Sequence, residues 1–443
     1  MKAPKPIELD GRTGEGGGQL VRIGCALAAV TSQPIRITHV RGNREGPRGG
    51  PKGGGLKSQH VSSIAWLAKV TEAEVIGLAV GSHTLEFRPK LKPSDLQSRT
   101  ITIAADSAAA STLLIFQAVF PFLLFAGNER GDPISIEISG GTNVSWSLSY
   151  EYLDQVLLPA LEDFFTGIRV ERTLKGRGWS QGRLQRGTIA FKIQPLRPGE
   201  TLKPRDPDRV FTQDDFDVSD IDVSMVAPSD MHEALADALV QDLSDLFPGV
   251  DVNFKVSEES GADSRIYVLL VARSETLRWG RDILTAVPKK GKSGSGGGGG
   301  GSKGVKGGKA SSGGVSVSVT DSVSRKVSKD LYEEVSNGGV VDEFLQDQVV
   351  IFQALAEGQT SFPHSAAQDD ILEVKSVVAG LEDAVEKLKI EEGPRKDKAH
   401  EPFGEGSTHT TTARWVTTEL LPQVAWYNKG RICKGVRMHI EKS

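Results

Sequence analysis

Apolar residues recur at helical spacing in four stretches of the first half of the chain, and alternating apolar and polar residues occupy the segments between them. The helical stretches are the stripe Leu20, Ile23, Gly24 and Leu27, the stripe Val61, Ile64 and Leu67, and residues 113–125 and 152–165. The alternating stretches are residues 35–38, 84–88, 100–103 and 134–138. This pattern predicts half-buried strands between amphipathic helices, and therefore an α+β (mixed α/β) fold.

The composition changes near residue 198. An acidic stretch at 214–222 precedes a helical pattern at 229–246 and strand-like runs at 250–254 and 266–271, which predicts a smaller second domain. Residues 289–314 are almost entirely glycine, serine and lysine and cannot bury a core. We therefore predict a large domain in two parts, residues 1–197 and 326–443. Between these parts lie a small α/β domain at 198–284 and a flexible insertion and linker at 285–325. The second part carries an insertion at 361–402, which contains one amphipathic helix at 371–388.

Composition limits the class of protein. Of the 443 residues, 38% are hydrophobic and 25% are charged, and the apolar runs are too short to span a bilayer, so we expect a globular protein without a membrane segment. The first residues lack the apolar core of a secretory signal, and the two cysteines, Cys25 and Cys433, form no disulfide framework. These features predict a reducing intracellular compartment and do not separate nucleus from cytosol, of which we expect the nucleus.

The charge is unevenly distributed. A net charge of −4 argues against general binding to polyanions. Between residues 36 and 57, however, six basic residues stand against the single acid Glu45; they are Arg36, Arg41, Arg44, Arg48, Lys52 and Lys57. This segment is either a phosphate-binding patch or a solvated basic loop, and its charge alone does not separate the two.

A glycine run begins at Asp10, with the sequence DGRTGEGGGQLVR ending at Arg22. Glycines let the backbone approach a ligand closely, and a helix that starts directly after them points its positive end at the same place. The run therefore predicts an anion site, although glycine clusters more often form turns only.

Two further segments carry chemically useful side chains. His409 falls in the first turn of a predicted helix with the inner stripe Ala413, Val416 and Leu420, where the helix N-terminus should keep the imidazole neutral and hence nucleophilic. Phe344, Asp347 and Gln348 share one face of another predicted helix, as a site that stacks a base and binds ribose hydroxyls requires. Each set has a structural alternative: the histidine packs at a helix end, or the phenylalanine belongs to the core while its neighbours are solvated.

Taken together, the motifs DGxxxEGGGQLVR, RGNR followed by LKxQH, VDEFLQDQ and STHTTTA resemble those of the RNA 3′-terminal phosphate cyclases. The resemblance implies a large domain of repeated units, each a sheet with two helices, into which a small α/β domain is inserted. It also implies ATP-dependent conversion of an RNA 3′-phosphate end to a 2′,3′-cyclic phosphodiester. RNA is thus the expected partner, and the oligomeric state stays open.

The resemblance implies a role for each matching residue. His409 would attack the α-phosphate of ATP and form a covalent histidyl-AMP intermediate. Gln117, Phe344, Asp347 and Gln348 match nucleotide-binding positions, and Glu15 matches the acid that holds Mg²⁺ or Mn²⁺. The RNA phosphate-binding positions are matched by Arg22, Arg41, Arg44, Gln59 and His60.

Some loops depart from the family pattern. The segment 106–111 lacks an expected glycine, Ser147, Leu148 and Glu151 replace an Ala-Pro pair and an aspartate, a glycine triplet is degraded at 182–187, and Phe344 replaces a tyrosine. A catalytically inactive cyclase-like factor of ribosome biogenesis, acting in pre-rRNA processing, is therefore the main alternative. The intact segments around His409 and Phe344 favour the enzyme, and they argue against an enolpyruvyl-type transferase of similar architecture.

Overall fold

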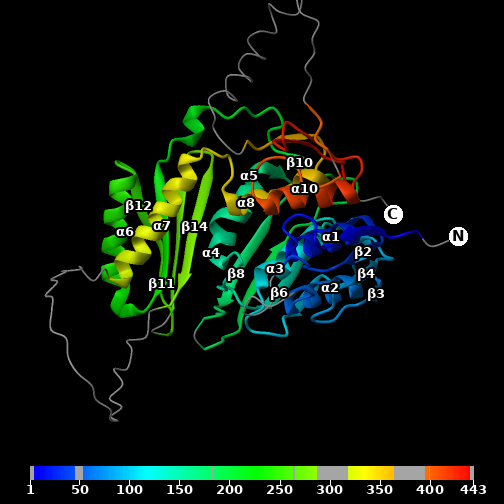
Figure 1. The fold of residues 1–443 in the computed structure, drawn as a ribbon, viewed down its shortest axis with the longest axis horizontal. Coiled ribbons are helices and arrows are strands. Elements are labelled where there is room, and N and C mark those ends of the chain that lie inside the picture. Colours follow the sequence, from blue (N-terminus) through cyan, green and yellow to red (C-terminus); the bar gives the residue numbers. More distant parts are fainter. Residues whose placement is uncertain are drawn as a thin grey trace, which may run out of the picture.

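The computed structural model describes residues 4–44, 53–181, 183–262, 265–286, 318–363, 395–398 and 400–439. The expectations for Glu45, Arg48, Lys52, the glycine-rich segment 289–314 and the helix 371–388 lie outside these residues. Figure 1 shows a large domain on the right and a smaller domain on the left. Within the described part of the chain, no helix combines the length and the apolar character that a membrane crossing requires.

The first unit of the large domain is a four-stranded sheet with two helices. Its elements are β1 (Ile7–Asp10), α1 (Gly18–Thr31), β2 (Ile35–Thr38), α2 (Ser58–Val70), β3 (Glu74–Ile76) and β4 (Leu85–Arg88). The strands lie in the order β1-β2-β4-β3, in which only β1 and β2 are parallel. The apolar side of α1 is fully buried, as the stripe predicts.

The second unit repeats this arrangement. Its elements are β5 (Thr100–Ala104), α3 (Thr112–Leu124), β6 (Ile134–Gly140), α4 (Tyr150–Tyr152), η3 (Leu153–Leu157), α5 (Leu158–Phe164), β8 (Val170–Gly176) and β9 (Gly187–Ile193). The order β5-β6-β9-β8 matches that of the first sheet. The single helix predicted at 152–165 is wrong in detail, because a π-helical turn interrupts it just before Pro159, whose ring nitrogen cannot donate a backbone hydrogen bond.

A third unit has two helices and three strands. It comprises α8 (Glu343–Leu355), β15 (Gln359–Ser361), α10 (Thr408–Leu420), β16 (Ala425–Tyr427) and β17 (Ile432–Lys434). The order β15-β17-β16 corresponds to the β2-β4-β3 part of the first sheet. A short antiparallel pair, β7 (Phe165–Thr166) and β10 (Lys203–Pro204), and the 3₁₀ turns η2 (Pro93–Asp95) and η4 (Gln213–Phe216) complete the connections. The repeated sheet-plus-two-helix architecture is confirmed.

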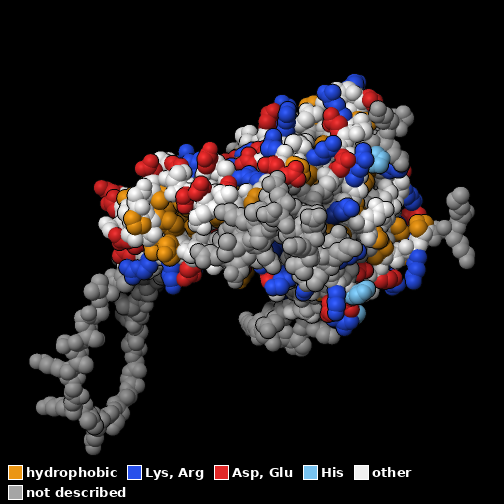
Figure 2. Space-filling view, turned by 90° about the horizontal axis from the view of Figure 1, so that it is seen from above, with side chains coloured by type: hydrophobic (Ala, Val, Ile, Leu, Met, Phe, Trp, Pro, Cys, Tyr) orange, Lys and Arg blue, Asp and Glu red, His pale blue; other side chains and the backbone are white. Residues whose placement is uncertain are grey.

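The small domain is a four-stranded sheet with two helices packed together. It comprises β11 (Asp220–Ala227), η5 (Ser229–Met231), α6 (His232–Leu246), β12 (Asp251–Glu259), β13 (Ile266–Arg273), β14 (Arg278–Thr285) and α7 (Val319–Ser336), with strand order β12-β11-β13-β14. Acidic side chains gather over this end of the molecule in Figure 2. Residues 319–325 were expected in the flexible linker and residues 326–336 in the large domain. They instead form α7, which has the buried stripe Val323, Val327 and Leu331 and packs against α6 and β14 of the small domain.

One buried carboxylate joins the two domains. Asp342 is fully buried at the N-cap of α8 and accepts hydrogen bonds from the Tyr152 hydroxyl (2.5 Å), the Gly280 amide (2.8 Å) and the Leu345 amide (2.9 Å). It therefore connects α4, α8 and the small-domain strand β14.

Replacing Asp342 with alanine should destabilise the protein by about 3 kcal/mol, because three buried donors lose their acceptor and α8 loses its cap. Urea unfolding of the purified variant measures the loss. Asp330→Ala on α7 is a suitable control, since Asp330 makes only a partly exposed pair with Lys326 and its loss should cost less than about 0.5 kcal/mol. Equal losses in the two variants would contradict the role given to Asp342.

Candidate nucleotide and phosphate site

Helices α1, α3, α8 and α10 lie together in the large domain, where α1 packs against α3 and α10, and α8 packs against α10 and α3 (Figure 1). Hydrogen bonds connect polar side chains from three of them. Arg22 on α1 donates to Gln117 on α3 (2.6 Å), Gln117 donates to Gln348 on α8 (2.7 Å), and Gln348 donates to Asp347 (2.9 Å). Four residues from distant parts of the sequence are thus brought into one chain of contacts, as the predicted site requires.

A second chain of contacts orients His409. Gln19 donates its side-chain amide to Asp347, and Gln19 Oε1 lies 3.1 Å from His409 Nδ1. A carboxylate can only accept, so the Gln19 NH₂ group faces Asp347 and its oxygen faces the histidine. His409 Nδ1 must then carry the proton, which leaves the lone pair on Nε2. Gln19 was not assigned a role from the sequence, although its position three residues before Arg22 places both on one face of α1.

His409 is the second residue of α10, in the first turn as predicted, and burial acts on its charge there. The pKa of His409 is lowered mainly by burial, with Arg22 and Arg44 adding to the effect and Asp347 opposing it. Desolvation disfavours the charged imidazolium wherever no strong partner compensates. Burial therefore favours the neutral imidazole, the state that was also expected at a helix N-terminus.

His60 and Arg22 face the start of α1. His60 is 2% exposed; its Nδ1 accepts a hydrogen bond from the Lys57 amide (3.1 Å), so Nε2 carries the proton. This Nε2 is buried and has no hydrogen-bond partner among the described residues. A Cβ added to Gly18 would lie 2.6 Å from His60 Nε2 and 2.9 Å from Arg22 Nη1. An unpaired buried donor, an arginine and a helix N-terminus at one place suit an anion.

Burial lowers the pKa of both His60 and Arg22, but the two residues end in different charge states at neutral pH. It lowers the pKa of His60 well below the ordinary range, with Arg22 and Arg41 adding to the effect, so His60 is neutral. It also lowers the pKa of Arg22, to about 10, which still leaves the guanidinium charged at neutral pH. The site thus offers one charged and one neutral donor.

Arg41 and Arg44 approach the glycine run from the loop after β2. Arg41 adopts a left-handed backbone conformation (φ 54°) and donates to the Gly55 carbonyl (3.2 Å), while Arg44 forms an ion pair with Glu15. Gln59 is the second residue of α2 and partly buried; among the described residues no hydrogen bond joins its side chain to this group. Contacts thus link Arg22, Arg44 and His60 to the site. Arg41 acts on Arg22 and His60 through its charge, and Gln59 is linked only by its place beside His60.

Glu15 fits the predicted metal ligand in one respect. Its side chain is 7% exposed, and Oε2 is buried with no hydrogen-bond partner in the described residues. The Glu15 amide donates to Thr412 Oγ1 (3.0 Å), which docks the glycine run on the helix that carries His409. No group of three or more His, Cys, Asp or Glu within the described ranges could hold a metal ion. A divalent ion at Glu15 would therefore take its other oxygen ligands from water and from a bound phosphate.

The predicted stacking residue, Phe344, already has one face covered. The Arg281 guanidinium lies 4.4 Å from the centroid of the Phe344 ring, and Tyr152 contacts the ring edge-on at 6.1 Å. Arg281 is held by ion pairs with Glu334 and Glu343. A base stacked on Phe344 would use the opposite face of the ring.

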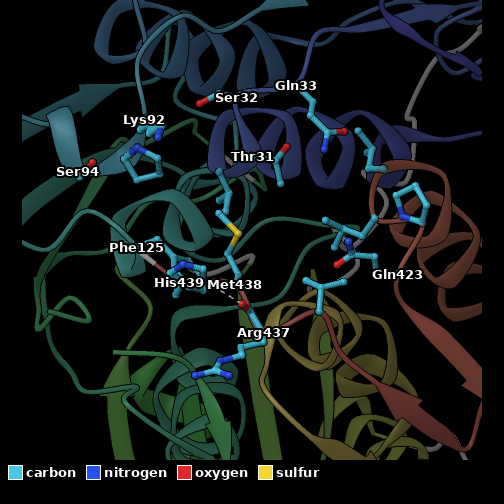
Figure 3. A pocket seen from close by; sticks show the side chains of 16 residues that line it. Thr31, Ser32, Gln33, Lys92, Ser94, Phe125, Gln423, Arg437, Met438 and His439 are labelled. Atoms are coloured by element: carbon cyan, nitrogen blue, oxygen red, sulfur yellow. Dashed lines mark hydrogen bonds between the residues drawn. The ribbon is translucent and has the colours of Figure 1, made fainter. Parts of the chain in front are cut away.

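A cavity lies at the other ends of two of these helices, α1 and α10. It has a volume of about 550 Å³ and is lined by residues at the C-terminal ends of α1 and α10 and by residues 436–439, including Arg437, Met438 and His439 (Figure 3). The C-terminal end of a helix carries a partial negative charge, which disfavours phosphate. This cavity is therefore separate from the phosphate cluster at the opposite ends of the same helices.

The fold and the cluster define a protein of repeated αβ units in which helix N-termini, arginines and a neutral histidine converge. The chain belongs to the RNA 3′-terminal phosphate cyclase family, whose family model matches residues 13–384. It is 32% identical over 356 residues to the RNA 3′-terminal phosphate cyclase of Thermococcus kodakarensis, covering 80% of this chain and 86% of that protein. The Pyrococcus furiosus protein of the same name is 31% identical over 354 residues, covering 80% and 87%. The family-model match ends before His409, so the case for this histidine rests on its contacts.

Proposed function

We propose that this protein converts RNA 3′-phosphate ends to 2′,3′-cyclic phosphodiesters with ATP, through a covalent intermediate on His409. The observation that carries the proposal is the contact chain from Asp347 through Gln19 to His409. It supports a neutral imidazole with its Nε2 lone pair available, which is the state that a nucleophile needs. Family membership supports the RNA chemistry.

Three transfers would complete the reaction. His409 Nε2 attacks the α-phosphorus of ATP, forming a P–N bond and releasing pyrophosphate. An oxygen of the RNA 3′-phosphate then attacks the same phosphorus, which breaks the P–N bond and frees the histidine. Finally the ribose 2′-hydroxyl attacks the 3′-phosphorus, and AMP leaves as the ring closes. The chemistry replaces a poor leaving group, oxide, by a good one, AMP.

The remaining residues bind and orient. Gln117, Asp347, Gln348 and the face of Phe344 opposite Arg281 would bind the nucleoside of ATP. Arg22, Arg41, Arg44 and His60 would hold the RNA 3′-phosphate, with Gln59 beside them. Glu15 would hold Mg²⁺ or Mn²⁺, which neutralises triphosphate charge when bound. Because Arg44 pairs with Glu15, it would have to turn toward the phosphate when the ion binds.

The test is incubation of the protein with ATP labelled at the α-phosphate, with magnesium or manganese, followed by denaturing electrophoresis. Label should remain on the protein and should move to RNA when a 3′-phosphate RNA is added. No label on the protein, combined with normal folding, would favour the inactive assembly-factor alternative. A nuclear location is a separate proposal, which imaging of the tagged protein tests.

The pH dependence of labelling should report the pKa of His409. Protonation of Nε2 removes the nucleophilic lone pair, so the rate should fall as pH falls through this pKa. Because burial lowers the pKa, the pH of half-maximal rate should lie below the ordinary histidine value of about 6.5. Initial rates of label incorporation measure this profile, and half-maximal labelling above about pH 7 would contradict it.

A further inference from the structure

The loop between β6 and α4 presents a tryptophan to solvent. The Trp146 side chain is 99% exposed, and its backbone adopts φ 64°, which bulky residues rarely do. The loop is held on both sides of it: the Ser145 amide donates to Ser180 Oγ (3.2 Å), and Ser147 Oγ lies 2.5 Å from Ser111 Oγ. Packing does not explain an exposed indole in an unfavourable conformation on an anchored loop, which is typical of a binding residue.

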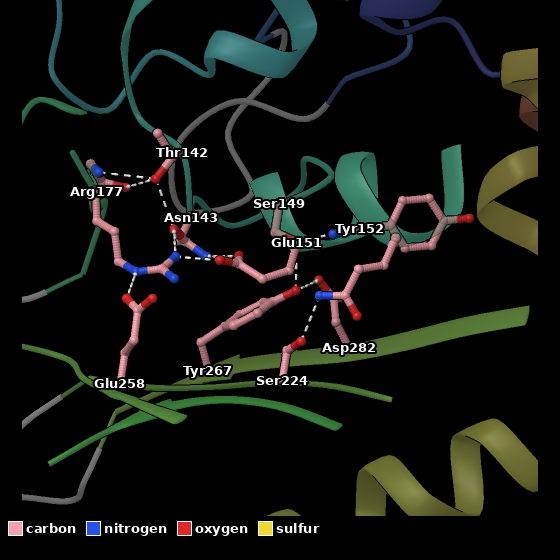
Figure 4. Close-up of polar contacts among 12 residues, drawn as sticks. Thr142, Asn143, Ser149, Glu151, Tyr152, Arg177, Ser224, Glu258, Tyr267 and Asp282 are labelled. Atoms are coloured by element: carbon pink, nitrogen blue, oxygen red, sulfur yellow. Dashed lines mark hydrogen bonds and ion pairs between the residues drawn. The ribbon is translucent and has the colours of Figure 1, made fainter. Parts of the chain in front are cut away.

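A polar cavity of about 320 Å³ adjoins this loop, at the junction of the two domains. Loop residues from Asn143 to Ser149 line one side, and Tyr267, Asp282 and Leu284 of the small domain line the other. Figure 4 shows Tyr267 and Asp282 projecting from the small-domain sheet toward Ser149. The Tyr267 hydroxyl contacts Ser149 Oγ (2.5 Å) and donates to Asp282 (3.2 Å). Cavities of this size between domains are common ligand sites.

Hydrogen bonds and ion pairs connect the Trp146 loop to the small domain. Glu151 is buried and bound by Asn143 (2.9 Å) and by Arg177, which also pairs with Glu258 of the small domain (2.9 Å; Figure 4). Glu151 stands where the family pattern has an aspartate, and both oxygens of its carboxylate have partners, a hydrogen bond from Asn143 and an ion pair with Arg177. The network fixes the Trp146 loop relative to the small domain.

A basic residue on the neighbouring loop adds positive charge. The Asn143 amide donates to the Gly178 carbonyl (2.9 Å), so the 177–187 loop runs beside the Trp146 loop. Arg186 on that loop is exposed, and its guanidinium donates to the Asp106 carbonyl (3.4 Å), in the turn that precedes α3. An exposed aromatic ring and an exposed arginine on adjoining loops form a combination by which proteins bind single-stranded nucleic acid.

The Trp146 loop lies close to the nucleotide and phosphate site. Ser111, which contacts Ser147, caps α3, and Gln117 lies six residues further along this helix. At the rise of an α-helix this separation is ~9 Å along the axis. Gln117 in turn is hydrogen-bonded to Arg22. A strand whose 3′-phosphate lies at Arg22 and His60 can therefore pass the Trp146 loop.

We propose that Trp146 is a stacking platform for a base of the RNA strand upstream of its 3′ end, and that Arg186 contacts the backbone phosphate beside it. The inference rests on the proposed function for the position of the 3′ end. Stacking on an indole tolerates any base, so the platform would add affinity without sequence preference. Its ligand is single-stranded RNA, and the base of ATP is the competing ligand that the test must separate.

The test measures binding of a fluorescent single-stranded RNA of about ten nucleotides with a 3′-phosphate, by anisotropy, to the full-length chain. Trp146→Ala should weaken binding about 10-fold, and Trp146→Phe, which keeps a ring, should restore most of it. Trp146→Gly should bind as weakly as the alanine variant while unfolding at the native temperature or above it, because glycine is favoured at positive φ. Phe254→Ala, which removes an exposed aromatic ring from β12, is the matched control and should bind like the native chain.

Several outcomes would overturn the proposal: native affinity in Trp146→Ala, equal weakening in Phe254→Ala, or no RNA binding by the native chain. A loss of labelling by ATP alone in Trp146→Ala would place the indole on the ATP base, which also overturns it. The failure of the proposed function has a different signature. If the native protein takes no label from ATP but its RNA affinity depends on Trp146, the platform stands and the cyclase reaction fails.

Discussion

His409→Ala is expected to take up no AMP from ATP, a loss of at least roughly a thousandfold in labelling rate. The variant lacks the only atom that we assign to attack, and the bond that it forms in the native protein should be an acid-labile, hydroxylamine-sensitive phosphoramidate. Denaturing electrophoresis after incubation with α-labelled ATP measures the loss. Circular dichroism checks that the fold of the variant is intact.

Two further variants make this experiment specific. Gln19→Leu keeps His409 but removes the acceptor that holds Nδ1–H, so its labelling rate should fall about 10- to 100-fold, as is typical when a supporting hydrogen bond is lost. His439→Ala removes a histidine from the distant C-terminal cavity and should be labelled at the native rate. Full labelling of His409→Ala would move the nucleophile to another residue.

Arg41→Lys and Arg44→Lys should each slow cyclisation of a 3′-phosphate RNA by roughly 10- to 100-fold at saturating RNA. Arginine grips phosphate with two parallel N–H donors, and lysine cannot copy this geometry. Before RNA binds, Arg41 is held by the Gly55 carbonyl, whereas Arg44 is paired with Glu15 and would have to leave that pair to reach the phosphate. Cyclisation rates at several salt concentrations are the measurement, with a 3′-hydroxyl RNA as the unreactive control.

Arg48→Ala and Lys52→Ala provide the comparison, although both residues lie outside the described part of the chain. They belong to the glycine- and proline-rich segment of the basic loop, so we expect them to act by long-range attraction. Their loss should weaken RNA binding in a salt-dependent way and change the rate at saturating RNA little. If all four variants behave alike, the basic segment only attracts RNA, and Arg41 and Arg44 do not belong to the site.

The sequence was sufficient where local periodicity and backbone chemistry act alone. The stripe at Leu20 and Leu27 predicted α1, the alternation at 134–138 predicted β6, and the position of His409 in the first turn of α10 followed from the same periodicity. These features depend on spacing within one segment. The sequence failed where neighbours in space decide, because the start of α7 at Val319 was not predicted. The π-helical turn was missed as well, although its cause, Pro159, is local.

For the site too, some features were predictable from the sequence and others depended on the tertiary structure. The sequence by itself determined which residue types are present, because the glycine run, the basic segment and the two helices that carry Phe344 and His409 are local patterns. Only the tertiary structure decided that Gln19 joins Asp347 to His409, that burial keeps His409 and His60 neutral, and that Arg44 pairs with Glu15. The physical reason is that hydrogen bonds and desolvation depend on atoms a few ångströms away in space, which in this protein come from segments hundreds of residues apart.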